Sequence, residues 1–338
     1  MDQHKKLSIC IVALNEEKYL PNLLTNVEQQ EYPHYLIEVV LVDGGSSDKT
    51  KQIMMEFASQ DNGFYNTQVL DNPKRIQAAG WNVAIKHATG DVIARIDAHT
   101  MLPAEFSRLV MRDISQGEDV VGGIRPCIIE NNTAWSRTLL AVENALFGSS
   151  INVSRRSGKK RNVKTMFHAS YRREVFEKVG LFNEKLLRTE DNEMHYRIRE
   201  KGFKLFFDPE IVSYQYARNS LLRMIKQKYG NGYWIGLTLG VCPKCISIYH
   251  FVPAVFVLGI LLTSILAIFG LWFFFALMWG MYVFFCVISM LWCFIKGERK
   301  LLFVAMPFLF LCLHVSYGIG TIIGLAGIAR FRKTIHEF

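Results

Sequence analysis

Short apolar runs alternate with amphipathic segments up to about residue 216. The runs have the length and the β-branched composition of buried strands, and the segments between them place apolar residues at helical spacing. The predicted strands are 7–14, 37–42, 68–70 and 92–96, and the predicted helices between them are 15–30, 49–59 and 75–87. This alternation predicts an α/β domain with a mostly parallel, doubly wound sheet.

The pattern beyond residue 100 still mixes helices and strands. The predicted helices are 103–116, 133–147, 169–179 and 190–201, and the predicted strands are 119–124, 203–207 and 211–216. The segment 220–229 combines leucines with cations, which fits either a helix on a membrane surface or one packed in a domain.

The last third of the chain has a different character, because residues 246–328 are almost uncharged apart from the cluster at 296–300. Three windows are each long enough to cross a hydrocarbon core of about 30 Å. They are 248–270, 271–295 and 301–328. We therefore predict an α/β domain over 1–216, an interfacial helical linker over 217–245 and a transmembrane region of about three helices over 246–330.

The distribution of Lys and Arg bears on the membrane topology, since these cations favour the cytosolic side. The cations before the first window and those at 296–300 fit that side. With three crossings, Arg330, Arg332 and Lys333 would lie outside, so either the last window is re-entrant or the rule fails here; we favour three crossings. Nothing before residue 7 resembles a signal peptide, so we expect the α/β domain in the cytosol.

Composition and charge narrow the choice of partner. The chain has 338 residues, of which 50% are hydrophobic, a formal net charge of +9 and seven cysteines. Its basic residues cluster near the membrane junction and over 155–164, where they suit anionic lipid and phosphate groups, so we exclude a nucleic-acid partner. The scattered cysteines are typical of reduced thiols.

Asp97 and His99 are the first candidates for chemistry, since both follow directly on the predicted strand 92–96. Ligands of open α/β sheets bind outside the carboxyl ends of the strands. An oxygen and a nitrogen ligand at such an end suit Mn²⁺ or Mg²⁺ holding a diphosphate. The alternative is a turn aspartate beside a surface histidine.

Four motifs in the appropriate order resemble those of family 2 glycosyltransferases of the GT-A fold. They are LSICIVALNEE at 7–17, VDGGSSD at 42–48, DAH at 97–99 and TED at 189–191, and the resemblance covers roughly residues 7–216. With NPKR at 72–75 and RNSL at 218–221, the chain is similar to the membrane-attached, ExoA-like subgroup of succinoglycan glucosyltransferases.

The resemblance implies roles on the donor side. Asp43 matches the acid that hydrogen-bonds the uracil of a UDP-sugar, and Asp97 matches the first acid of the DxD metal motif, with His99 in place of the second. The implied nucleotide-sugar-binding residues are Ala13, Asn15, Glu16, Asp43, Arg75 and Asp97. The alternative for Arg75 is a solvated cation at a helix start.

On the acceptor side, Asp191 matches the general base that takes the proton of the attacking hydroxyl. The alternative for Glu190 and Asp191 is that acids in a first helical turn complement the helix dipole. Glu190, His168 and Arg218 are the candidates for acceptor contact. A basic loop could draw in a lipid-linked diphosphate or simply be solvated; its cations are Arg155, Arg156, Lys159, Lys160 and Arg161.

The resulting hypothesis is an inverting, Mn²⁺- or Mg²⁺-dependent glycosyltransferase at the cytosolic face of a prokaryotic plasma membrane. It would move a sugar from a UDP-sugar to a polyprenyl-diphosphate-linked saccharide, beside membrane lipid, for an exported polysaccharide. Alternatives are a polyprenyl-phosphate glycosyltransferase and a catalytically inactive GT-A membrane scaffold. A processive synthase is disfavoured because Gln227 does not begin a Gln-x-x-Arg-Trp motif. A transporter is disfavoured because the windows contain no Asp, Glu, Lys or Arg and, away from their ends, only His314 as a residue that can carry a charge near neutral pH.

Overall fold

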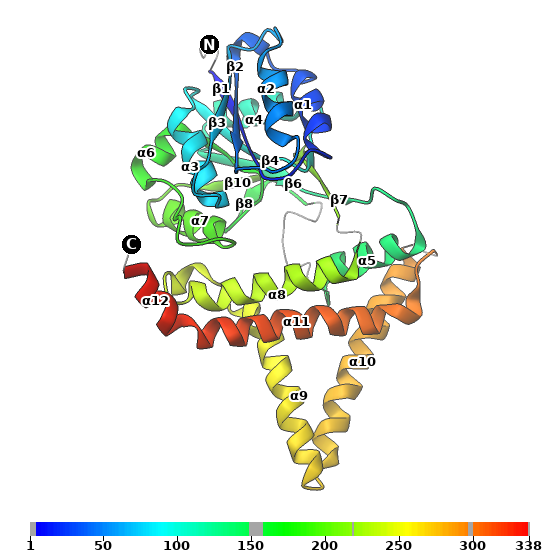
Figure 1. The fold of residues 1–338 in the computed structure, drawn as a ribbon. Helices are drawn as coiled ribbons and strands as arrows, with labels where there is room; N and C mark the ends of the chain where they lie inside the picture. Colours follow the sequence, from blue (N-terminus) through cyan, green and yellow to red (C-terminus); the bar gives the residue numbers. More distant parts are fainter. Residues whose placement is uncertain (1–4, 149–157, 218–219, 297–299, 337–338) are drawn as a thin grey trace. The chain divides into compact units, whose positions relative to one another are not determined.

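The computed structural model describes residues 5–148, 158–217, 220–296 and 300–336. The chain forms two compact units, Met1–Ile128 with Val153–Tyr216, and Ile129–Asn152 with Ala217–Phe338. The first unit is an α/β domain and the second is helical (Figure 1). The predicted boundaries at 216 and 245 stay predictions.

The α/β unit is built on an eight-stranded sheet in the order β3-β2-β1-β4-β9-β6-β10-β8. The strands are β1 (Leu7–Ala13), β2 (Ile37–Asp43), β3 (Asn66–Asp71), β4 (Val92–Asp97), β6 (Val120–Ile124), β8 (Arg161–Asn162), β9 (Ser170–Arg172) and β10 (Leu205–Val212). β3, β2, β1 and β4 are parallel neighbours and so are β6 and β10, whereas β8 and β9 run antiparallel. The predicted α/β class with a mostly parallel sheet is confirmed.

Helices cover both faces of this sheet, because its central strands are buried on both sides. One face packs against α1 (Leu20–Glu28), α2 (Thr50–Ala58) and α4 (Phe106–Ser115). The other packs against α3 (Gln77–His87), α6 (Arg173–Val179) and α7 (Glu190–Glu200). A small second sheet consists of β5 (Thr100–Met101), β11 (Tyr214–Tyr216) and β7 (Cys127–Ile128).

Two predicted helices of this unit were wrong in part. The helix predicted over 169–179 begins only at Arg173, because Ser170–Arg172 pairs with β4 and β6 as strand β9. The helix predicted over 15–30 begins at Leu20, since Asn15 adopts a φ of 57° in a turn that precedes it. In both places pairing between distant segments overrides the local helical pattern.

The second unit consists of α5 (Ala134–Asn144), α8 (Leu221–Thr238), α9 (Val252–Ile268), α10 (Trp272–Ile295), α11 (Met306–Ala326) and α12 (Ile328–His336). Three helical segments of the described chain are long and apolar enough to cross a membrane: Ile248–Ile268, Trp272–Ile295 and Phe303–Ala326. α9 and α10 form a hairpin, and α11 lies alongside α8 (Figure 1). α8 extends nine residues beyond the end of the predicted 220–229, and α5 packs on α11.

Glycines let α8 and α11 approach closely, and this predicts the first measurable effect. A Cβ on Gly324 would lie 2.1 Å from the carbonyl oxygen of Tyr233. Gly324→Ala should therefore force the helices apart and lower the free energy of unfolding by about 1–3 kcal/mol. The matched control is Gly280→Ala on α10, whose Cβ would meet no described atom within 4 Å. Melting of both variants in detergent checks this; equal stability of the two would contradict the packing.

Candidate active site

The parallel strands bring a row of acidic residues to one edge of the sheet. Asp43 at the end of β2 is in register with Ala13 on β1 and with Asp71 on β3, and Asp97 on β4 is in register with Val12. Because these are the carboxyl ends of parallel strands, this edge is where ligands of α/β sheets bind. The sequence-predicted residues Ala13, Asp43 and Asp97 thus share one edge.

Two loops at this edge are joined by hydrogen bonds. The Asn15 side-chain oxygen accepts from the backbone N–H of Ser47 at 2.8 Å, and the backbone N–H of Asn15 donates to Ser46 Oγ at 3.0 Å. The Asp43 carboxylate is buried and accepts from the backbone N–H groups of Gly45 and Ser46. These bonds hold the loop after β1 and the loop after β2 as one rigid wall of the site.

Arg75 also reaches this wall. A Cβ on Gly45 would lie 2.6 Å from Nε of Arg75, and Gly45 has a φ of +82°, so a larger residue there would be strained and would displace this guanidinium. Arg75 itself has a φ of 57°, in the left-handed region that few non-glycine residues adopt. The structure therefore brings a cation directly beside the loop that carries Asp43.

Asp97 is held from two sides. His168 Nε2 lies 3.2 Å from its Oδ2, and Gln77 Nε2 donates to its Oδ1 at 3.4 Å. His168 is itself buried, with Nδ1 2.8 Å from Ser213 Oγ. Burial acts to raise the pKa of Asp97, but the hydrogen bond with His168 and neighbouring positive charge, including that of Arg95, outweigh it, so this pKa lies below its ordinary value. The carboxylate is thus oriented and ionised.

His99 is held in the same way by two partners. Its Nδ1 lies 3.1 Å from Oε1 of Glu16, and its Nε2 lies 2.9 Å from the Gln215 side-chain nitrogen on β11. Its ring is about one-fifth exposed, and so is the side chain of Glu16. The predicted metal residue His99 and the predicted nucleotide residue Glu16 therefore form one cluster.

These side chains fit a divalent cation that shares its ligands with a diphosphate. Among the described residues, no group of three or more His, Cys, Asp and Glu side chains is arranged to hold a metal ion. Mg²⁺ is typically bound through one or two carboxylates together with substrate phosphates and water, so a site of this kind needs no such group. The carboxylate of Asp97 is partly exposed and is an oxygen donor of the kind that this mode requires.

Asp191 is joined to the strand that carries Asp97. Arg95 lies two residues before Asp97 on β4, and both of its terminal nitrogens donate to the Asp191 carboxylate, the Nη2–Oδ2 distance being 2.8 Å. The side chain of Arg95 is 5% exposed and that of Asp191 is 18% exposed. The Arg95 guanidinium also lies 5.0 Å from the ring centroid of Trp81. A two-bond contact of this kind fixes the orientation of a carboxylate as well as its position.

Glu190 precedes Asp191 at the start of α7 but is buried rather than open to the site. Its Oε2 has no hydrogen-bond partner in the described part of the chain. Burial, and next the charge of Asp191, raise the pKa of the Glu190 carboxyl to about 8. Glu190 is therefore protonated at neutral pH in the folded protein.

This raised pKa predicts a pH dependence of stability. Between the ordinary pKa of 4.5 and about 8 the folded state binds one more proton at Glu190 than the unfolded state. Stability should therefore fall as the pH rises through that window, by at most roughly 1.4 kcal/mol per pH unit. Glu190→Gln keeps the shape and removes this titration, so its melting temperature should fall less than that of the wild type between pH 5.5 and 8. Parallel slopes would contradict the prediction.

The remaining predicted site residues are either outside the described residues or paired away from this edge of the sheet. Arg218, Arg155 and Arg156 are outside the described residues. Of the remaining cations of the basic loop, Lys160 pairs with Asp208 at 2.8 Å and Arg161 lies over the Phe207 ring. Lys160 and Arg161 are thus held on the α/β unit and do not form part of a free basic loop.

Arg95, Gln77 and Gln215 are site residues that the sequence did not predict. Arg95 had a detectable signal, because a cation inside an otherwise apolar buried strand requires a partner. Gln77 and Gln215 had none, since an amide in a helix start or in a short strand is ordinary.

The comparisons with known proteins agree with this fold. Residues 8–180 match the family model "Glycosyl transferase family 2". The dolichyl N-acetyl-alpha-D-glucosaminyl phosphate 3-beta-D-2,3-diacetamido-2,3-dideoxy-beta-D-glucuronosyltransferase of Methanococcus voltae is 32% identical over 92% of this chain and 95% of its own length. The succinoglycan biosynthesis protein ExoA of Rhizobium meliloti is 29% identical over 66% of this chain and 67% of its own.

A solved structure shares the fold over most of the chain. The mannosyltransferase of Pyrobaculum calidifontis, determined with GDP-Man and Mn²⁺, has a TM-score of 0.59 at 15% identity and covers 95% of this chain and 87% of its own. The fold is therefore the GT-A fold, and the family model defines the class as glycosyltransferase. The chain belongs to glycosyl transferase family 2, and the resemblance to its ExoA-like members is confirmed.

Proposed function

We propose that this glycosyltransferase inverts the anomeric centre of a nucleotide-activated sugar, with Asp191 as the general base. The observation that carries the proposal is the Arg95–Asp191 contact. It fixes the Asp191 carboxylate, which is partly exposed at the start of α7, relative to β4, the strand that ends in Asp97. Transfer by in-line displacement requires that the base and the acid near the diphosphate are held in a fixed relative position, and connected secondary-structure elements provide this.

In this mechanism Asp191 accepts the proton of the acceptor hydroxyl while the hydroxyl oxygen attacks the anomeric carbon. The bond from that carbon to the diphosphate oxygen breaks in the same displacement, so the configuration inverts and the nucleoside diphosphate leaves. Arg95 is a positioning residue, since both of its terminal nitrogens engage the carboxylate and it has no exposed face for substrate.

On the donor side, Asp43, Asn15 and Ala13 would line the nucleotide and Arg75 would meet its diphosphate. Asp97, with His99 beside it, would hold Mn²⁺ or Mg²⁺, which stabilises the negative charge on the departing diphosphate. Support comes from the shared edge of the sheet and from the Pyrobaculum relative, whose structure contains GDP-Man and Mn²⁺.

We assign His168 and Glu190 roles other than the acceptor contact that the sequence suggested. Both side chains are buried, at 2% and 4% exposure. His168 bridges Asp97 and Ser213, so it orients the acid of the metal motif. Glu190 is a buried neutral acid at the start of α7 and does not face the acceptor.

The acceptor we propose is a polyprenyl-linked saccharide, with the domain on the cytosolic side of a prokaryotic plasma membrane. The Methanococcus relative is named for a dolichyl-phosphate-linked N-acetylglucosamine acceptor, and the Rhizobium relative for succinoglycan biosynthesis. Three apolar helices suit an acceptor whose lipid lies in the membrane.

The test is release of nucleoside diphosphate by the detergent-purified full chain. A panel of UDP-sugars with GDP-mannose is offered with Mn²⁺, with Mg²⁺ or with chelator, with and without a polyprenyl-diphosphate-linked saccharide. Turnover of one donor that requires the cation and produces the opposite anomer supports the proposal. Retained configuration would overturn the mechanism. Absence of both turnover and cation-dependent donor binding would favour an inactive scaffold.

A further inference from the structure

Close backbone contacts between α8 and α11 restrict how the helical unit can be oriented in a membrane. A Cβ on Gly320 would lie 2.2 Å from the carbonyl oxygen of Tyr229, and one on Gly232 would lie 2.0 Å from that of Tyr317. Farther along the two helices, a Cβ on Gly324 would likewise lie 2.1 Å from the carbonyl oxygen of Tyr233. Residue numbers rise together on the two helices, so α8 and α11 are parallel and in backbone contact over several turns (Figure 1).

α8 is unsuited to a hydrocarbon environment. It carries Arg223, Lys226 and Lys228 within 18 residues, and Arg223 and Lys226 are exposed. Lys228 is buried in an ion pair with Glu143 of α5, at 3.2 Å. Each cation at the centre of a bilayer costs about 2.5–3.5 kcal/mol on the insertion scale. α8 therefore lies at the membrane surface, and α11, packed along it, lies at the same level.

The connection between the two helices leads to the same conclusion. α9 and α10 are antiparallel, since Phe256 stacks on Tyr282 at 4.8 Å and Thr263 meets Met278 at 3.5 Å. The hairpin therefore returns the chain to the side that it left. It joins the C-terminal end of α8 to the N-terminal end of α11. Because the two helices run parallel, these two ends lie at opposite ends of the α8–α11 pair. If the pair crossed the bilayer, the two ends would lie on opposite sides, which a two-crossing hairpin cannot connect.

The hairpin itself has the features of a complete crossing. α9 and α10 contain no charged residue. The described structure provides no side-chain cap for the first N–H groups of α10, so they need a polar environment. Trp272 at this end suits the far headgroup region, where tryptophan is enriched.

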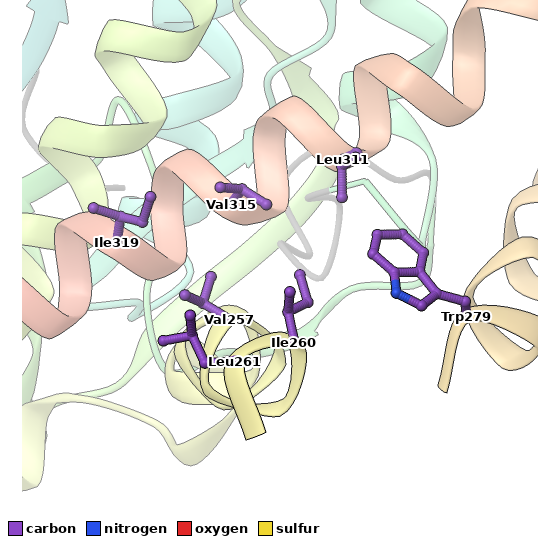
Figure 2. A pocket seen from close by; sticks show the side chains of 7 residues that line it. All are labelled: Val257, Ile260, Leu261, Trp279, Leu311, Val315 and Ile319. Atoms are coloured by element: carbon purple, nitrogen blue, oxygen red, sulfur yellow. The ribbon is translucent and has the colours of Figure 1, made fainter. Parts of the chain in front are cut away.

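Between the hairpin and α11 there is an apolar cavity of about 360 Å³ (Figure 2). Leu311, Val315 and Ile319 of α11 line it at intervals of four residues, together with Val257, Ile260 and Leu261 of α9. α11 therefore presents an apolar face toward the hairpin and the hydrocarbon, whereas exposed cations lie on α8 and, as Arg332 and Lys333, on α12.

We infer that the partner of the α8–α11 pair is the headgroup layer of a bilayer and that the chain crosses this bilayer only twice, through α9 and α10. α11 lies along the surface although it is apolar enough to cross. The start of α8, Lys296 and Lys300, and the cations of α12 then share one side. This arrangement satisfies the Lys/Arg rule that three crossings violate.

The test uses the full chain in bacterial membranes with one epitope tag before residue 1 and another after residue 338. Protease is added to inverted vesicles and, separately, to right-side-out vesicles. Loss of both tags in the same preparation is expected. Protection of the C-terminal tag where the N-terminal tag is cut would mean three crossings and would overturn the inference.

Two further fusions complete the design. A tag inserted after Gly270, in the turn between α9 and α10, should be cut only in the opposite preparation; cutting from the same side would show that the hairpin does not cross. A tag inserted after Lys300 in the full chain is the control, because both topologies place that tag beside the N-terminal one. The result does not depend on the proposed reaction.

Discussion

Asp191→Asn is expected to lower turnover by roughly 10²- to 10⁴-fold, the range that a general base contributes. The amide keeps the shape of the carboxylate but cannot take the proton of the acceptor hydroxyl. Donor binding should be nearly unchanged, because the proposed nucleotide and diphosphate residues lie on other elements. Nucleoside diphosphate release and cation-dependent donor binding, measured on the same preparation, separate these two effects.

The control for this variant is Glu193→Gln on the same helix. Glu193 pairs with Arg197 at 2.7 Å, so the substitution also removes an ion pair of α7 but leaves the proposed base intact. It should retain most of the turnover. Wild-type turnover of Asp191→Asn, or an equal loss in both variants, would remove Asp191 from the role of base.

Arg95→Leu is expected to lower the free energy of unfolding by about 3 kcal/mol, at the lower end of the 3–5 kcal/mol range for breaking a buried pair. The lower end applies because Asp191, left without its partner, is 18% exposed and gains some solvation. Turnover should fall as well, since the carboxylate loses its fixed orientation. Thermal melting of the full chain in detergent measures the first effect.

A double variant separates stability from chemistry. Replacing a whole buried pair by apolar residues is often neutral or stabilising. Arg95→Met combined with Asp191→Leu should therefore melt closer to the wild type than Arg95→Leu does, while remaining inactive. If Arg95→Leu alone melts like the wild type, the pair contributes nothing to stability and the positioning role of Arg95 loses its support.

The sequence by itself determined the class of fold and predicted that several of the proposed donor-side residues share one edge of the sheet. Alternating strands and helices require a sheet covered on both faces, and residues at the carboxyl ends of parallel strands must share an edge. Asp43 and Asp97 could therefore be grouped before any coordinates were known. The same patterns located the three apolar helices, since length and lack of charge are local properties.

Tertiary structure alone decided which groups touch. Arg95 and Asp191 are 96 positions apart, and only the packing of α7 on the sheet brings them together. The burial of His168 and Glu190 likewise depends on neighbours from distant segments. For the apolar helices, sequence indicates which ones tolerate hydrocarbon, but the direction in which α11 packs on α8 determines which ones enter it. Hydropathy does not report that packing direction, because it is a sum of single-residue values that does not depend on which residues are in contact.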